Sequence, residues 1–230
     1  MKGRTELITG LDVDTREDAL AAVDIAAGCA WFKIGAQLFT RCGPAIVEAV
    51  RDRGKQVFLD LKYHDIPNTV AGASRAAAAL GAKLFTLHAS GGKAMIAAAR
   101  NAVEGTDTRI LAVTVLTSLT DDMLRQEVGL PETAAEAVPR LARLAVEAGA
   151  HGIVCSPREI AMVRETVGPA PLIVTPGIRP RWASKDDQAR IMTPREAAEA
   201  GADMIVVVRP ILKHENPPEA VRLILEELQG

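Results

Sequence analysis

An aspartate and a lysine two residues apart interrupt an apolar stretch that has the pattern of a β-strand. Asp60 and Lys62 follow Val57, Phe58 and Leu59, and side chains on a strand alternate between its two faces. We therefore expect the Asp60 carboxylate and the Lys62 ammonium to point the same way. Burying such a pair costs several kcal/mol per ion, so it adds little to a folding core. The pair predicts a reaction centre, and the alternative is a structural ion pair.

Further polar residues stand at the ends of the other apolar stretches. They are Asp12, Lys33, Asp65, His88, Thr117, Arg179 and Arg209. Ammonium and carboxylate groups that meet in one place can stabilise developing charge and transfer protons. The two arginines add planar, permanently charged donors that suit a phosphate group. Structural interpretations stay open as well: helix caps for Asp12 and Thr117, a solvent-reaching side chain for Lys33, a core histidine for His88, and an ion pair for Arg209.

Eight apolar stretches are expected to form the strands that position these residues. They span 7–11, 30–34, 57–62, 84–87, 110–116, 152–155, 172–175 and 204–208. Nearly continuous apolar strands indicate a parallel sheet that is covered on both faces. Eight strand–helix units in 230 residues fit one α/β domain over residues 1–230, a (β/α)8 TIM barrel. A doubly wound open sheet is the alternative, but it usually has a glycine-rich first turn, where this chain has Asp12-Val13-Asp14.

Glycine and proline mark the ends of the expected helices. A glycine precedes five of the strands, and we expect it to end each helix in the left-handed conformation. These glycines are Gly28, Gly54, Gly81, Gly149 and Gly201. Helix starts are predicted at 156–159, 193–196 and 216–219, where a capping residue is followed by proline and then glutamate.

The composition is that of an ordinary globular protein, with 48% hydrophobic and 24% charged residues. A net charge of -2 and 3% aromatic residues predict no nucleic-acid or membrane-surface partner. No apolar run approaches the roughly 18 residues of a membrane span, and the first residues have no signal-peptide pattern. Cys29, Cys42 and Cys155 are far apart and odd in number, so we expect reduced thiols in a cytoplasmic protein.

The stretch from 179 to 191 is long, polar and placed after the seventh strand, so it predicts a lid that closes on a bound ligand. The turn before it and Arg209 predict a phosphate site, because loops seven and eight of this fold commonly hold phosphate. A metal site is not expected, since the carboxylates alternate with lysines and His64 has no partner at ligand spacing.

Five features together resemble the orotidine 5′-phosphate decarboxylase family: Asp12, Lys33, the block 60–69, the turn 175–179, and the stretch 188–194. The resemblance covers essentially the whole chain, and the block 60–69 is its most specific part. It implies a cofactor-free barrel that converts orotidine 5′-phosphate into uridine 5′-phosphate and CO2 in de novo pyrimidine synthesis.

The resemblance also implies roles for the residues of the block. Lys62 would give the proton to the pyrimidine carbon that loses CO2, with Asp60 and Asp65 beside it. Lys33 would complete an alternating Lys-Asp-Lys-Asp chain and contact the ribose. Asp65 and Thr69 would reach the site of the neighbouring subunit, which implies a catalytic homodimer.

Substrate-binding roles are implied for residues on several other loops. By the family pattern, Asp12 would bind the ribose and Thr117 would contact the pyrimidine. Three residues would bind the phosphate: Arg179, Gln188 and Arg209. The residue before Arg209 is usually glycine in the family, with its N–H on phosphate, and is Val208 here. The lid has Asp186 where the family generally has glycine, which predicts a stiffer hinge.

Two other functions remain as alternatives. The first is a sugar-phosphate barrel enzyme of the hexulose-phosphate synthase or ketogulonate-phosphate decarboxylase type, in which the Asp-x-Lys-x-x-Asp block holds Mg²⁺. The continuation 66–69 and Gln188 favour the cofactor-free decarboxylase over it. The second is a phosphometabolite-binding barrel without turnover, which Val208 suggests.

Overall fold

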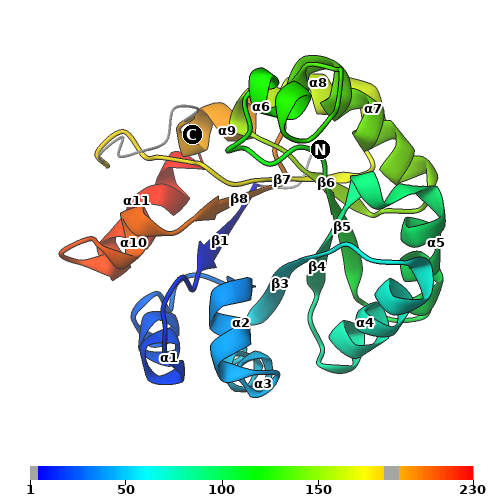
Figure 1. The fold of residues 1–230 in the computed structure, drawn as a ribbon. Coiled ribbons are helices and arrows are strands. Elements are labelled where there is room, and N and C mark those ends of the chain that lie inside the picture. Colours follow the sequence, from blue (N-terminus) through cyan, green and yellow to red (C-terminus); the bar gives the residue numbers. More distant parts are fainter. Residues whose placement is uncertain (1–4, 184–191, 230) are drawn as a thin grey trace.

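The structure, a computed structural model, describes residues 5–183 and 192–229. Eight parallel strands form a closed barrel in the order β1 to β8, with the helices around it (Figure 1). The strands are β1 Glu6–Gly10, β2 Trp31–Gly35, β3 Gln56–Tyr63, β4 Leu84–His88, β5 Arg109–Val113, β6 Gly152–Val154, β7 Leu172–Thr175 and β8 Met204–Val207. The predicted (β/α)8 barrel is confirmed, and β1 pairs with β8 to close it.

Helices follow the strands along the chain and pack on the outside of the barrel. The α-helices are α1 Arg16–Ile25, α2 Ala36–Cys42, α3 Ala45–Arg51, α4 Pro67–Ala79, α5 Gly92–Ala102, α6 Asp121–Gln126, α7 Ala134–Glu147, α8 Ile160–Val167, α9 Pro194–Ala200, α10 Arg209–Leu212 and α11 Pro217–Glu227, and two 3-10 turns are Ala89–Gly91 and Pro157–Glu159. Within the described part of the chain, no helix has the length and apolar character needed to cross a bilayer.

The helix boundaries follow the predicted signals, with one exception. Gly54, Gly81, Gly149 and Gly201 all have a positive φ, as a left-handed helix end requires. The prediction for Gly28 was wrong, because its φ is not positive. Helix α1 is followed instead by a turn in which the Cys29 N–H donates to the Ala26 carbonyl oxygen at 2.8 Å.

The predicted helix starts are confirmed. Thr193 and Ser156 each form a reciprocal capping box with the glutamate three residues on. The Asn216 side chain accepts a hydrogen bond from the Glu219 N–H ahead of α11. These caps satisfy backbone donors that would otherwise have no partner at a helix start.

Two apolar layers fill the molecule. The larger lies between the strands and the helices. The smaller, which we call the barrel plug, lies inside the barrel and consists of Ile8, Phe58, Leu84, Leu111, Val174, Met204 and Val206. Phe58 points into the barrel, and alternation along β3 therefore turns Asp60 inward above the plug.

Strand β3 changes its pairing just after Asp60. Its register with β4 shifts between Leu59 and Tyr63, and Lys62 has a φ of 51°. Simple alternation therefore does not continue to Lys62, although the expectation drawn from it was right. The Lys62 Nζ lies 2.8 Å from the Asp60 Oδ1, because the irregular backbone turns this side chain back over the barrel.

Candidate active site

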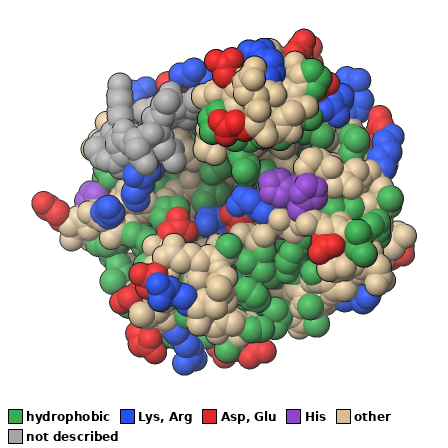
Figure 2. All heavy atoms as spheres, in the orientation of Figure 1, with side chains coloured by type: hydrophobic (Ala, Val, Ile, Leu, Met, Phe, Trp, Pro, Cys, Tyr) green, Lys and Arg blue, Asp and Glu red, His purple; other side chains and the backbone are tan. Residues whose placement is uncertain are grey.

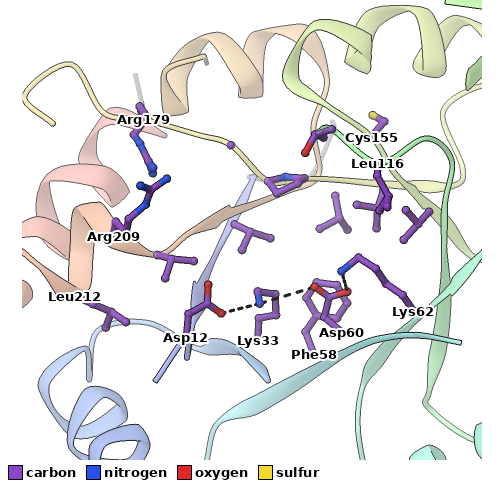
Figure 3. A pocket seen from close by; sticks show the side chains of 18 of the residues that line it. Asp12, Lys33, Phe58, Asp60, Lys62, Leu116, Cys155, Arg179, Arg209 and Leu212 are labelled. Atoms are coloured by element: carbon purple, nitrogen blue, oxygen red, sulfur yellow. Dashed lines mark hydrogen bonds and ion pairs between the residues drawn. The ribbon is translucent and has the colours of Figure 1, made fainter. Parts of the chain in front are cut away.

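A cavity of about 710 Å³ opens at the carboxyl ends of the strands (Figure 3). In the space-filling view, lysine or arginine and acidic side chains gather inside a hollow with histidines beside it (Figure 2). Eight of the predicted site residues line the cavity: Asp12, Lys33, Asp60, Lys62, Thr117, Arg179, Val208 and Arg209. Gln188 lies outside the described residues. Strand ends from most of the barrel therefore meet at one site, as predicted.

Four of these residues form a row of alternating charge across the cavity floor. The Lys33 Nζ lies 3.0 Å from the Asp12 Oδ1 and 3.8 Å from the Asp60 Oδ2. The Lys62 Nζ lies 2.8 Å from the Asp60 Oδ1. The side chains of Lys33 and Asp60 are only 13% and 14% exposed, so their attraction is weakly screened by solvent.

Thr86 belongs to this row but was not predicted from the sequence. It is fully buried on β4, where its hydroxyl donates to the Asp60 Oδ1 at 2.9 Å. The Thr86 Oγ1 in turn accepts a hydrogen bond from the Lys62 backbone N–H, also at 2.9 Å. A threonine inside an apolar strand is common, and only the irregular pairing of β3 with β4 brings this one to Asp60.

An apolar wall faces the charged row. It includes Val113, Val115, Leu116, Val154, Cys155, Val174 and Pro176. Strand β5 ends at Val113 and not at Leu116 as predicted, so the residues after it form a loop that contributes to this wall. Burial raises the pKa of the Cys155 thiol to about 12, which keeps this part of the wall uncharged. Such a surface strengthens the electrostatic interactions beside it.

Two arginines lie across the cavity from Lys62. Arg179 and Arg209 extend toward one another from the segments after β7 and β8 (Figure 3). Arg179 is 5% exposed, and its backbone N–H donates to the Met192 carbonyl oxygen at 3.0 Å. This bond holds Arg179 close to Met192, the residue that follows the predicted lid. Residues 184–191 of that lid lie outside the described residues.

Asp65 and Thr69 do not line the cavity of their own chain. Both are exposed, Asp65 in the loop between β3 and α4 and Thr69 in the first turn of α4. The Asp65 Oδ1 accepts a hydrogen bond from the Ile66 N–H at 2.6 Å, and Ile66 itself is 67% exposed. A large apolar side chain thus stands in solvent beside the two residues expected to serve a neighbouring subunit.

Gly10 makes room for two side chains of the site. A Cβ at Gly10 would lie 2.5 Å from the Val208 Cγ2 and 3.2 Å from the Lys33 Cε. A Cβ at Gly35 would lie 3.1 Å from the Lys33 Nζ. Glycine at these strand ends therefore leaves space for Lys33 to cross the barrel, and at Gly10 also for Val208.

Gly10→Ala is expected to destabilise the fold by about 1–3 kcal/mol, the usual cost of overpacking. The added methyl would displace Val208 and Lys33, so kcat should fall as well. The double variant Gly10→Ala/Val208→Gly removes the first clash and should recover most of the lost stability. Chemical denaturation of the parent protein and the two variants measures this, and equal stability of the single and double variants would contradict the packing argument.

His64 and His88 form a tilted ring pair at the edge of the site, with centroids 5.4 Å apart. Burial lowers the pKa of His88, and the charges of His64 and Lys62 act in the same direction, while Asp60 opposes them. Protonated His88 would therefore bring a further positive charge against the Lys62 ammonium.

The lowered pKa of His88 predicts a loss of stability in mild acid. The unfolded chain binds a proton at the ordinary pKa of 6.5, and the folded protein binds it only at lower pH. The contribution of neutral His88 to the free energy of unfolding is therefore fully present above pH 6.5. It is lost as the pH falls below that value toward the lower pKa of the folded protein. In His88→Gln, the decline of Tm between about pH 7 and pH 5 should be shallower. Parallel Tm curves for the two proteins would contradict this.

Across residues 5–183 and 192–229, no cluster of three or more histidine, cysteine or acidic side chains has the arrangement of a metal site. The Asp60 carboxylate faces an ammonium group on each oxygen, Lys62 at Oδ1 and Lys33 at Oδ2. Its negative charge is already balanced by these groups, which makes it a poor ligand for a divalent cation.

Comparison with known proteins gives a consistent result. Residues 5–224 match the model of the family described as "Orotidine 5'-phosphate decarboxylase / HUMPS family". Orotidine 5′-phosphate decarboxylases of Heliobacterium modesticaldum and Pelobacter propionicus are 48% and 51% identical to the chain. Each alignment covers 99% of the chain and 97% or 96% of the relative. The crystal structure of the enzyme named orotidine 5′-phosphate decarboxylase from Lactobacillus acidophilus superimposes with a TM-score of 0.88 at 37% identity, covering 99% of this chain and all of that one. The chain therefore belongs to the orotidine 5′-phosphate decarboxylase / HUMPS family.

Proposed function

We propose that this protein decarboxylates orotidine 5′-phosphate to uridine 5′-phosphate and CO2, as a carboxy-lyase of pyrimidine biosynthesis. The observation that carries the proposal is the charged row of Asp12, Lys33, Asp60 and Lys62 in the same cavity as two arginines. The row suits a reaction that leaves negative charge on carbon. The arginines suit the phosphate of a nucleotide.

Lys62 is the proposed centre of the chemistry. Loss of CO2 leaves an electron pair on a ring carbon, and an ammonium held nearby stabilises that charge as it develops. The same ammonium can then give its proton to the carbon, which forms the C–H bond of the product. Asp60 accepts from the Lys62 Nζ at 2.8 Å, which fixes the direction of the ammonium before substrate arrives.

The remaining cavity residues bind the rest of the nucleotide in this proposal. Asp12 and Lys33 contact the ribose, Thr117 the pyrimidine, and Arg179 and Arg209 the phosphate, with Gln188 and the Val208 N–H also assigned to the phosphate. Binding energy from this remote group is best used where it supports the transition state.

The decisive experiment is a spectrophotometric assay of the purified protein with orotidine 5′-phosphate, with and without EDTA. We expect turnover that the chelator does not change, because the proposed chemistry uses lysine and no metal or cofactor. Loss of activity with EDTA would support the magnesium-dependent alternative, which the named relatives do not favour. Tight binding of uridine 5′-phosphate without CO2 release would support the binding-only alternative.

We propose that the working form is a homodimer in which Asp65 and Thr69 complete the partner's site. Both lie outside their own chain's cavity, beside the exposed Ile66. Lys62→Ala and Asp65→Ala should each be nearly inactive alone. Unfolding and refolding them together should restore about a quarter of the sites, because half of the dimers are mixed and each has one intact site. No recovery on mixing would place Asp65 in its own chain's site.

A cytoplasmic location completes the proposal. All three cysteines are free thiols, and Cys29 and Cys155 are buried with raised pKa values caused by burial. Such thiols are protected from oxidation and need no oxidising compartment.

A further inference from the structure

Thr86 connects the two residues at the centre of the proposed chemistry. Its hydroxyl donates to the Asp60 Oδ1 at 2.9 Å and accepts from the Lys62 N–H at 2.9 Å. Thr86 is fully buried and does not line the cavity. It therefore contacts Asp60 and Lys62 from its position on β4, without reaching the cavity in which a substrate would bind.

The Lys62 backbone needs such a partner because it is irregular. Lys62, with a φ of 51°, is the one non-glycine residue with a positive φ in the described segments. Residues rarely keep this conformation unless their surroundings hold them in it. The register of β3 with β4 shifts here, passing from the pair Leu59 and Phe85 to the pair Tyr63 and Leu87. Thr86 stands opposite the shift, and its side-chain oxygen takes the place of a strand acceptor for the Lys62 N–H.

The same hydroxyl also fixes the Asp60 carboxylate. The Asp60 Oδ1 accepts from both the Thr86 Oγ1 and the Lys62 Nζ, at 2.9 and 2.8 Å. One oxygen therefore receives two donors, and the carboxylate cannot rotate without losing both. Since the ammonium of Lys62 is aimed by this carboxylate, Thr86 controls the main chain and, through Asp60, the side chain of the lysine.

We propose that Thr86 is a positioning residue that sets the direction of the Lys62 ammonium toward the reacting carbon. The inference rests on the proposed function, since it assigns Thr86 a role in that reaction. A displacement of about 1 Å at a reacting group can cost up to 10²-fold in rate. The effect belongs to the chemical step, because the arginines that suit the phosphate lie across the cavity.

The test compares four variants in steady-state assays with orotidine 5′-phosphate. Thr86→Val keeps the shape and removes both hydrogen bonds, while Thr86→Ser keeps both. Thr86→Cys keeps the size with only a weak donor and acceptor, and it serves if the valine variant does not fold. Thr108→Val is the matched control. Thr108 is a buried threonine immediately before β5, outside the cavity lining, and its hydroxyl donates to the Ala82 carbonyl oxygen at 2.8 Å.

We expect kcat of Thr86→Val to fall at least tenfold, with KM within about threefold of the parent. Thr86→Ser should stay within about threefold of the parent in kcat, Thr86→Cys should be intermediate, and Thr108→Val should be unchanged. An unchanged kcat in Thr86→Val, or an equal loss in Thr108→Val, would overturn the inference while leaving the proposed function intact. Absence of turnover by the parent protein would instead refute the proposed function.

Discussion

Lys62→Ala is expected to lower kcat by well over 10²-fold, since positioned proton transfer alone contributes that much. The variant also leaves Asp60 facing the cavity without its nearest cation, which lies 2.8 Å away in the parent protein. The remaining charge would repel an anionic substrate, so KM should rise as well. The measurement is loss of orotidine 5′-phosphate at substrate concentrations up to saturation.

The matched control is Lys83→Ala. Lys83 pairs with Asp107 at 2.9 Å, a similar distance, and both residues lie beside a second cavity lined by residues from the amino-terminal ends of strands. Its removal should leave kcat unchanged. Near-normal turnover by Lys62→Ala, with the control unchanged, would exclude the proposed mechanism.

Removal of the arginine pair is expected to have the second-largest effect. A hydrogen bond to a charged group contributes about 1.5–3 kcal/mol, so Arg209→Ala should lower kcat/KM by roughly 10- to 100-fold. Arg179→Ala/Arg209→Ala should lower it further. With orotidine, which has no phosphate, parent and variants should differ little, because the group that the arginines bind is missing.

Arg222→Ala is the control for this series. Arg222 forms ion pairs with Glu219 and Glu226 on α11 and does not line the cavity. If Arg209→Ala weakened turnover of orotidine as much as that of the nucleotide, the arginine would act on the fold or the chemistry and not on the phosphate.

Most of the architecture was predictable because it rests on local signals. Apolar runs of strand length, glycine at helix ends, and proline with glutamate at helix starts each depend on a few neighbouring residues. Position in the barrel then follows from topology, which places Asp12, Lys33 and Arg209 at the same end of the barrel. Gly28 shows the limit of such signals, because a turn after α1 replaced the expected helix end.

The rest of the site depends on contacts that no local pattern records. The register shift beside Lys62 and the hydroxyl of Thr86 are known only from the pairing of β3 with β4. The fit of Gly10 against Val208 joins the first and last strands. The roles of Asp65 and Thr69 stay predictions, because they concern a second copy of the chain.

The barrel plug limits how substrate, product and protons can enter and leave the cavity. Its residues, among them Ile8, Phe58 and Val174, are almost completely buried below the charged row. In the proposed reaction every turnover takes up one proton, and a proton does not readily cross a dry hydrocarbon layer when a wider opening stands above it. The nucleotide, its product and the replacement proton therefore use the same opening at the carboxyl ends of the strands. Closing this opening would delay the proposed re-protonation of Lys62 until the product departs.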